Sequence, residues 1–175
     1  MLAAVDDWWP EDKAPEPRIV EVARQLEAAL ARQPRHTGLN HYLIHALDAS
    51  PEVGRAVAAA DRLGALAPLS PHLVHMPSHI HVRVGRYGDA TAENEQALAL
   101  DTTLAAELQR QGFKVSKDWR GHNSRFAWFA ALMEGRGELA LQQARGIANR
   151  SAKSAHVWGE LARSLPIVTL ARLER

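Results

Sequence analysis

The apolar residues of this chain recur at helical spacing along most of its length. Over residues 17–32 they share one helix face, formed by Ile19, Val22, Ala23, Leu26, Ala29 and Leu30. The same spacing predicts further helices over residues 38–48, 52–66, 71–84, 87–100, 123–134, 137–149 and 153–172. No alternating strand pattern competes. We therefore expect an all-α protein with an irregular lead-in over residues 1–16, where Pro10 and Pro15 limit helix formation.

The helical pattern repeats every 34 residues. His41 and His75 are 34 residues apart, as are Ala56 and Ala90. This period is typical of tetratricopeptide repeats, in which stacked helix pairs form a solenoid with a concave groove. We therefore predict a single TPR-like α-helical domain over residues 1–175. Its expected parts are an N-terminal half repeat over 17–32, repeats over about 37–68, 71–102 and 121–152, and a C-terminal cap over 153–175.

Two features interrupt this pattern. Pro77 falls inside the helix predicted over residues 71–84, where a proline kinks a helix or starts it anew. Residues 102–122 hold an insertion between the second and third repeats. We expect this insertion to form a helical extension and a loop reaching over the groove.

Histidine is the unusual component of the sequence. Nine histidines are present, seven of them between residues 36 and 81. Two pairs, His41 with His45 and His75 with His79, have a spacing of four residues. This spacing puts both imidazoles of a pair on one helix face, with their Cβ atoms roughly 5–6 Å apart. The repeat period puts the pairs at equivalent positions on the concave face, and neutral imidazole is the commonest metal ligand. The predicted ligands on this face are His41, His45, His72, His75, His79 and His122.

Polar residues beside these histidines offer supporting roles. Asp48 follows His45 by three residues, so it can complete the facial triad of an iron site or orient zinc-binding imidazoles. We interpret Arg83 as solvated or salt-bridged, with contact to an anionic ligand as the alternative. The side chains that can orient rings or contact a substrate are Asn40, Asn94 and Asn123.

Other chemistries find no support in the sequence. The absence of Cys excludes thiolate ligands, iron–sulfur clusters and cysteine nucleophiles. Neither a Ser-His-Asp order, a phosphate loop, a Rossmann fingerprint nor His-Glu-x-x-His is present, so the catalytic residues stay unknown. We interpret His36, His81 and His156 as ordinary hydrogen-bonded core residues. The residues interpreted as packing aromatics are Trp8, Trp9, Trp128, Phe129 and Trp158.

Composition and charge limit the classes of binding partner that we expect. Hydrophobic residues make up 46% of the chain and the formal net charge is +1, so no strong field favours nucleic acid or an anionic membrane. Residues 1–9 lack the pattern of a signal peptide, and no apolar run is long enough to span a membrane. We expect a cytoplasmic protein, with a homo-oligomer left open.

Three stretches resemble signatures of a bacterial tetratricopeptide-repeat family. The first is HTGLNHYLIHALDAS over residues 36–50, and the second is HLVHMPSHI over residues 72–80. The third begins at His122-Asn123 and ends at Gly135-Arg136. The resemblance covers most of residues 36–136 and implies the repeat fold and the histidine positions. The family has no settled activity, and its members are longer, so we expect a compact version.

Two positions depart from that family. The family has a histidine at the place of Arg125 and an aromatic residue at the place of His81. Arg125 cannot bind a metal, so we expect it to grip an anionic group instead.

The leading hypothesis is a small TPR-like metalloenzyme whose histidine-lined groove holds a transition metal and acts on a peptide or small molecule. Copper or zinc is favoured over iron, because Asp48 is the one carboxylate on the two histidine stripes. The reaction can be that of a copper oxidase or oxygenase, or it can be zinc-dependent. The alternatives are a non-catalytic peptide-binding module, and a protein for metal storage or delivery. Which metal is bound, and whether one ion or two, stays open.

Overall fold

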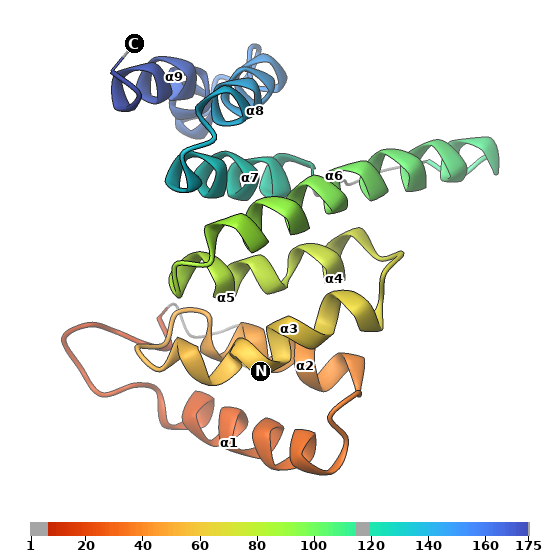
Figure 1. The fold of residues 1–175 in the computed structure, drawn as a ribbon, viewed down its shortest axis with the longest axis vertical. Helices are drawn as coiled ribbons and strands as arrows, with labels where there is room; N and C mark the ends of the chain where they lie inside the picture. Colours follow the sequence, from red (N-terminus) through yellow and green to blue (C-terminus); the bar gives the residue numbers. More distant parts are fainter. Residues whose placement is uncertain (1–6, 115–119, 175) are drawn as a thin grey trace. The chain divides into compact units, whose positions relative to one another are not determined.

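The computed structural model describes residues 7–114 and 120–174, and within these ranges it is helical without strands (Figure 1). The prediction of an all-α protein is therefore confirmed. The chain divides into two compact units, Met1–Gly85 and Arg86–Arg175, and each is described by itself below. The prediction of a single domain over residues 1–175 stays a prediction.

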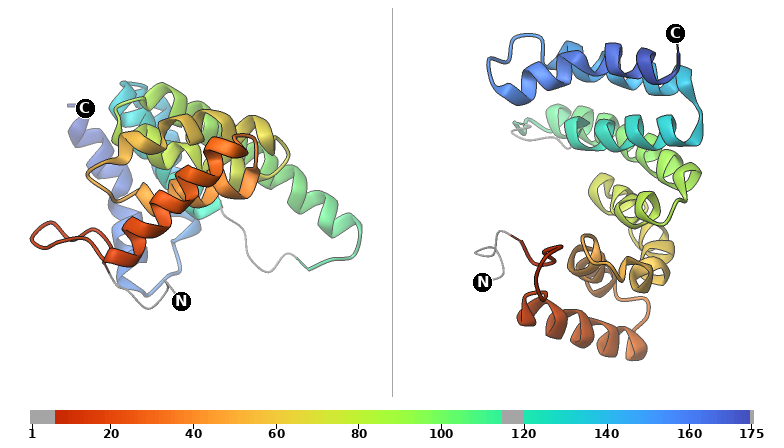
Figure 2. Two further views of the ribbon diagram at one scale, coloured as in Figure 1. Left: turned by 90° about the horizontal axis from the view of Figure 1, so that it is seen from below. Right: turned by 90° about the vertical axis from the view of Figure 1, so that its left-hand side faces the viewer.

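The first unit is built from helices that pack in sequence order (Figures 1 and 2). Its elements are α1 (Pro17–Arg32), α2 (Thr37–Leu47), the short 3-10 helix η2 (Val53–Ala56), α3 (Val57–Leu66), α4 (Pro71–His75) and α5 (Pro77–Arg83). Helix α2 packs against α1 and α3, and α3 packs in turn against α4 and α5. The apolar core of this unit includes Ile19, Ala23, Leu43, Ile44, Leu47, Ala59, Ala60, Leu63, Met76 and Ile80.

Side-chain caps fix where the histidine-bearing helices begin. The Nδ1 atom of His36 accepts a hydrogen bond from the backbone N–H of Leu39 at 3.2 Å, which caps α2. The Ser70 hydroxyl accepts from the N–H of Leu73 at 3.4 Å and caps α4, whose first residue is Pro71. Both arrangements satisfy backbone donors that a helix start leaves open.

The predicted interruption at Pro77 is confirmed. Helix α4 ends at His75, and α5 begins at Pro77. Proline has no N–H to donate to the carbonyl four residues earlier, so the helix cannot continue undisturbed. At the break, the Ser78 hydroxyl donates to the carbonyl of His75 at 2.7 Å. The break separates His72 and His75 on α4 from His79 on α5.

The second unit consists of α6 (Tyr87–Arg110), α7 (Arg120–Glu134), α8 (Gly137–Arg150) and α9 (Val157–Arg172). Each helix packs against the next, as the stacked ribbons in Figure 1 show. Alanines let the helix axes approach closely; those fully buried include Ala90, Ala97, Ala127, Ala130, Ala131, Ala140 and Ala144. Gly135 turns the chain between α7 and α8 with a φ of 88°, a conformation that favours glycine.

Most predicted boundaries lie within a few residues of the observed ones, and the helix predicted over 17–32 has the bounds of α1. Two differ more. Helix α6 runs to Arg110 instead of ending at residue 100, which agrees with the helical extension expected in the insertion. The last helix begins at Val157 instead of residue 153, because His156 caps it by accepting from the N–H of Trp158 at 3.2 Å. Part of the predicted loop, residues 115–119, lies outside the described residues.

Among the described helices, none combines the length and the apolar character that crossing a membrane requires.

Candidate metal centre

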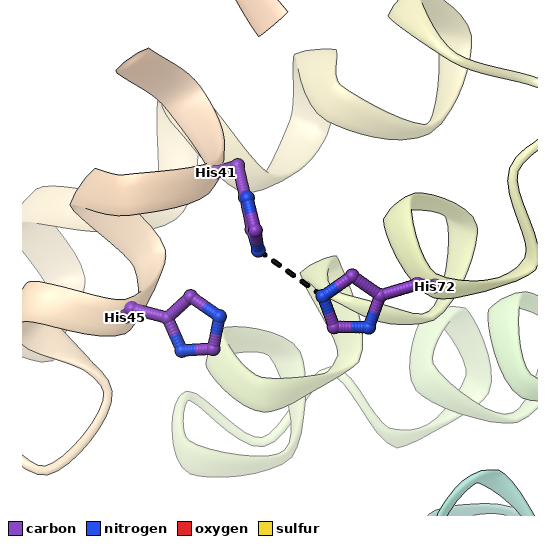
Figure 3. A group of neighbouring side chains, drawn as sticks. All are labelled: His41, His45 and His72. Atoms are coloured by element: carbon purple, nitrogen blue, oxygen red, sulfur yellow. Dashed lines mark hydrogen bonds between the residues drawn. The ribbon is translucent and has the colours of Figure 1, made fainter. Parts of the chain in front are cut away.

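Three of the predicted ligands meet in the first unit. His41 and His45 lie one turn apart on α2, and His72 lies on α4. One ligand nitrogen from each lies within 4.8 Å of the other two. Figure 3 shows the three rings, which come from two helices and point toward one another. The Nε2 atoms of His41 and His72 are 3.2 Å apart. We call these three residues the histidine trio.

The local sequence explains this convergence. The spacing of four residues puts His41 and His45 on the same face of α2, with ring centroids 4.7 Å apart. Helix α3 packs against both α2 and α4 and so holds these two helices beside each other. The His72 ring then meets the His41 ring edge-on, with centroids 5.1 Å apart.

His75 and His79 form a second close pair in the same unit. Their Nε2 atoms are 3.0 Å apart, across the break between α4 and α5. Two nitrogens bound to one tetrahedral zinc ion, each at 2.0–2.1 Å, lie about 3.3 Å from each other. The Nε2–Nε2 distance within this pair is therefore close to that of two nitrogens bound to one ion, and so is the Nε2–Nε2 distance between His41 and His72.

Asp48 fixes the orientation of His79. The Nδ1 atom of His79 is 2.9 Å from Asp48 Oδ2. A carboxylate only accepts hydrogen bonds, so Nδ1 carries the proton and donates it. In the neutral ring Nε2 then keeps its lone pair. A carboxylate behind the imidazole is the usual support for a metal-ligating histidine.

The second oxygen of Asp48 is also engaged, because Oδ1 accepts from Arg83 Nε at 3.0 Å. The side chain thus hydrogen-bonds to His79 and Arg83, which is the orienting role among the two considered from sequence. Arg83 was interpreted as solvated or salt-bridged, with an anionic ligand as the alternative, and the structure gives it a salt bridge to Asp48.

The trio and the pair are continuous. The His45 and His79 rings are 6.3 Å apart between centroids, so five imidazoles form one group. We call His41, His45, His72, His75 and His79 the histidine cluster. Its burial varies, since His75 is fully buried while His45 is exposed to solvent. The cluster therefore has both a sheltered end and an open end.

The surroundings keep the trio neutral. Burial lowers the pKa of His41 to about 4, helped by the proximity of His45, His72 and His79. Burial also lowers the pKa of His45 and His72, with neighbouring imidazoles acting in the same direction. Burial alone would raise the pKa of Asp48, but the hydrogen bonds and charges of His79 and Arg83 lower it. At neutral pH the trio thus offers unprotonated nitrogens, the form that binds metals.

The remaining predicted site residues lie elsewhere. Asn40 is buried in the first unit, where Nδ2 donates to the carbonyls of Pro34 and His36 and Oδ1 accepts from Arg62. Its bonds hold the start of α2 and reach none of the cluster rings. The second unit contains the other predicted site residues, which are Asn94, His122, Asn123 and Arg125.

Within the second unit these residues have partners of their own. The His122 ring is exposed and lies 5.0 Å from the Phe126 ring between centroids. Asn123 Nδ2 donates to Asp101 Oδ2 at 3.0 Å. Asn94 Nδ2 donates to the carbonyl of Ala90 at 2.7 Å. That His122, Asn123 or Arg125 contributes to the metal site stays a prediction.

The three histidines interpreted as core residues have different outcomes. The interpretation holds for His81, which is buried and contacts Asp61 Oδ1 through Nε2 at 3.2 Å. It is wrong for His36 and His156, which are exposed and cap α2 and α9. A ring nitrogen can accept a backbone hydrogen bond as a serine or aspartate oxygen does, so histidine serves as a cap here.

Sequence reasoning missed two supports of the site. Ser78 lies behind His75, with its hydroxyl 3.4 Å from the Nδ1 atom of that ring. Trp9 donates from Nε1 to the carbonyl of Ala46 on α2 at 2.9 Å, which ties the lead-in to the helix that carries His41 and His45. The position of Ser78 one turn after His75 was a usable signal. The contact of Trp9 spans 37 residues and left no local trace.

No protein-family model, curated protein or solved structure matches this chain.

Proposed function

We propose that this chain is a TPR-like repeat protein that binds a transition metal through His41, His45 and His72 and uses the ion in catalysis. The observation that carries the proposal is the convergence of three ligand nitrogens to within 4.8 Å of one another. Like-charged groups at such separations repel when protonated, whereas neutral imidazoles around a cation attract it. The lowered pKa of His41, about 4, supports the same proposal.

Zinc or copper suits this donor set better than iron. Both metals accept sites made of imidazole, whereas the common non-haem iron site requires two histidines and a carboxylate. Asp48, the nearest candidate carboxylate, already binds His79 and Arg83 with its two oxygens. In this role it supports an imidazole and adds no ligand of its own.

A catalytic role fits the number of ligands and the exposure of the site. Three protein ligands leave a coordination position open on zinc, as in catalytic zinc sites, whereas structural zinc sites use four. His45 is exposed, so solvent and a small molecule or peptide can reach the trio. A bound ion there supplies Lewis acidity or an activated water. His75 and His79 provide a second pair of nitrogens within the same unit.

The repeat part of the proposal rests on the agreement between period and structure. The 34-residue spacing relates His41 to His75, and both occupy the same inward-facing position of their repeats in the proposed register. Helices α2 and α3 form the first predicted pair, and α7 and α8 form the third. Small residues at Ala56, Ala90 and Ala140 are fully buried, as the repeat register requires.

Elemental analysis of protein purified without an affinity tag tests the proposal. We expect about one equivalent of zinc or copper per chain for the trio, and a second if the His75–His79 pair also fills. His72→Ala should lose the ion of the trio, whereas the matched control His156→Ala should keep it. Zinc-loaded wild type should hydrolyse 4-nitrophenyl acetate faster than zinc-treated His72→Ala. Wild type that takes up neither metal, or His72→Ala with undiminished metal content, contradicts the proposal.

A further inference from the structure

An apolar pocket adjoins the histidine trio within the first unit. Its volume is about 430 Å³, which falls in the range of small-molecule sites. Its walls are almost entirely apolar and come from the lead-in, α1 and α2. The lining includes Trp8, Ile19, Val22, Leu26, Tyr42 and His45. Such a lining holds the apolar body of a ligand.

The pocket is held in shape by hydrogen bonds behind its walls. Trp9 Nε1 donates to the carbonyl of Ala46 on α2 at 2.9 Å. The backbone N–H of Glu16 donates to the carbonyl of Trp8 at 3.0 Å. These bonds fix the Trp8–Trp9 segment against α2 at one side of the cavity. A pocket formed in advance costs a ligand less ordering on binding.

Aromatic side chains distinguish this lining from an aliphatic cavity. Trp8 and Tyr42 both line it, and Tyr42 is 61% exposed, so its ring can turn toward a ligand without opening the core. The Tyr42 ring also stacks on His41, with centroids 5.2 Å apart and an angle of 28° between the planes. Aromatic groups favour the offset-stacked and edge-to-face contacts that such walls offer.

His45 joins the pocket to the metal site. Its side chain lines the cavity and is also one of the three nitrogens of the trio. A ligand filling the pocket therefore lies against an imidazole that binds the proposed metal. The rest of the cavity wall is apolar, so the polar end of a ligand finds its partner on the side of His45.

We infer that the pocket binds the aromatic ring of the substrate and that an oxygen or nitrogen donor on that ring reaches the metal ion held by the trio. The inference rests on the proposed metal site and adds the class of substrate. A phenol-type group has this chemistry, whether it belongs to a free small molecule or to a tyrosine side chain.

Matched probes test the pocket and the metal contact separately. Toluene and 4-methylphenol differ by one hydroxyl and share the apolar body. Binding of each is measured by calorimetry and ligand-detected NMR, with chelator and with one equivalent of zinc. We expect both probes to bind metal-free protein. Zinc should raise the affinity for 4-methylphenol by about tenfold or more. The affinity for toluene should stay within about twofold of its metal-free value.

Variants assign these effects to residues. Val22→Phe fills the cavity, so it should lower the affinity for both probes at least about tenfold. The metal content should stay unchanged. Val157→Phe adds the same bulk at a 64%-exposed position of α9 and should change neither. His72→Ala removes a trio residue that does not line the pocket, so it should abolish the effect of zinc while toluene still binds.

The outcomes separate this inference from the proposed function. Equal binding by wild type and Val22→Phe overturns the pocket as the ring site. If the protein binds zinc but its affinity for 4-methylphenol does not rise, the proposed contact between the donor atom and the metal is overturned. Wild type that binds toluene but no metal refutes the proposed function and leaves an apolar pocket without the metal contact. A comparison of 4-methylphenol with N-acetyltyrosinamide shows whether the ring comes from a free molecule or from a peptide.

Discussion

Acid should destabilise the metal-free protein through its histidine trio. In the folded state the pKa of His41 is about 4, compared with 6.5 for an unperturbed histidine. Between these values the unfolded chain binds a proton that the folded chain excludes. The free energy of unfolding therefore falls as the pH drops from 6.5 towards 4, and the stability is fully present above that window. The lowered pKa values of His45 and His72 act in the same direction.

The size of the effect follows from the shift at His41. The difference of 6.5 − 4 = 2.5 units corresponds to about 3.4 kcal/mol over the whole window. Between pH 7 and pH 5 the same values give about 1.8 kcal/mol. His41 is only partly buried, so screening by solvent reduces this to about 1 kcal/mol. Asp48 does not contribute in this range, because its lowered pKa puts its effect below about 3.8.

Urea unfolding followed by circular dichroism measures this prediction. Wild type and His41→Gln are unfolded at pH 7 and pH 5 in the presence of a chelator. Wild type should lose about 1 kcal/mol more stability than His41→Gln between the two pH values. His156→Gln, which removes an exposed histidine of the second unit, is the control: losing the cap of α9 lowers its stability at both pH values, but its loss between pH 7 and pH 5 should equal that of wild type. Identical pH dependence for wild type and His41→Gln refutes the claim that the fold holds His41 neutral.

Two further predictions concern the support of the site and the packing of the helices. Asp48→Asn should weaken zinc binding at the His75–His79 pair by about 10–100-fold in a chelator competition, because His79 loses the carboxylate behind it, and should leave the ion of the trio in place. Asp61→Asn, which removes a partner of His81, should weaken neither; equal losses in both variants would count against the orienting role. Gly159→Ala should reduce the free energy of unfolding by about 1–3 kcal/mol, since its Cβ would lie 2.5 Å from a neighbouring side chain. Gly64→Ala, in open space on α3, should instead stabilise the protein by about 0.5–1 kcal/mol. Denaturant midpoints measure the stability of both variants. A Gly159→Ala variant as stable as wild type would show that the turn before α9 relaxes freely.

The helices were predictable because their signals are local. Apolar spacing gave α1 its bounds, and the position of Pro77 indicated the break between α4 and α5. The start of α9 was misplaced because histidine is a rare cap and His156 was not considered as one. Apolar periodicity alone ended the predicted helix near residue 100, because the residues beyond it are polar on most faces, and the run of α6 to Arg110 was expected only as a helical extension of the insertion.

The site was predictable in its composition and less so in its connections. The spacing of His41 and His45 places two rings on one helix face. The 34-residue period predicts that the histidines of the next repeat lie on the same side. Which nitrogen meets which depends on how α3 holds α2 and α4, and that depends on packing across the unit. The hydrogen bond that His79 donates to Asp48 and the pocket beside His45 arise from contacts distant in the sequence, so no local pattern predicts them.

The coordination of the bound metal is the most direct test of the central claim. X-ray absorption at the zinc edge is recorded for wild type loaded with one equivalent of zinc, and for His72→Ala treated alike. The account predicts a first shell of nitrogen or oxygen at about 2.0–2.1 Å, with scattering from three imidazoles in wild type and fewer in the variant. A wild-type spectrum with no imidazole scattering, or one unchanged by His72→Ala, would contradict it.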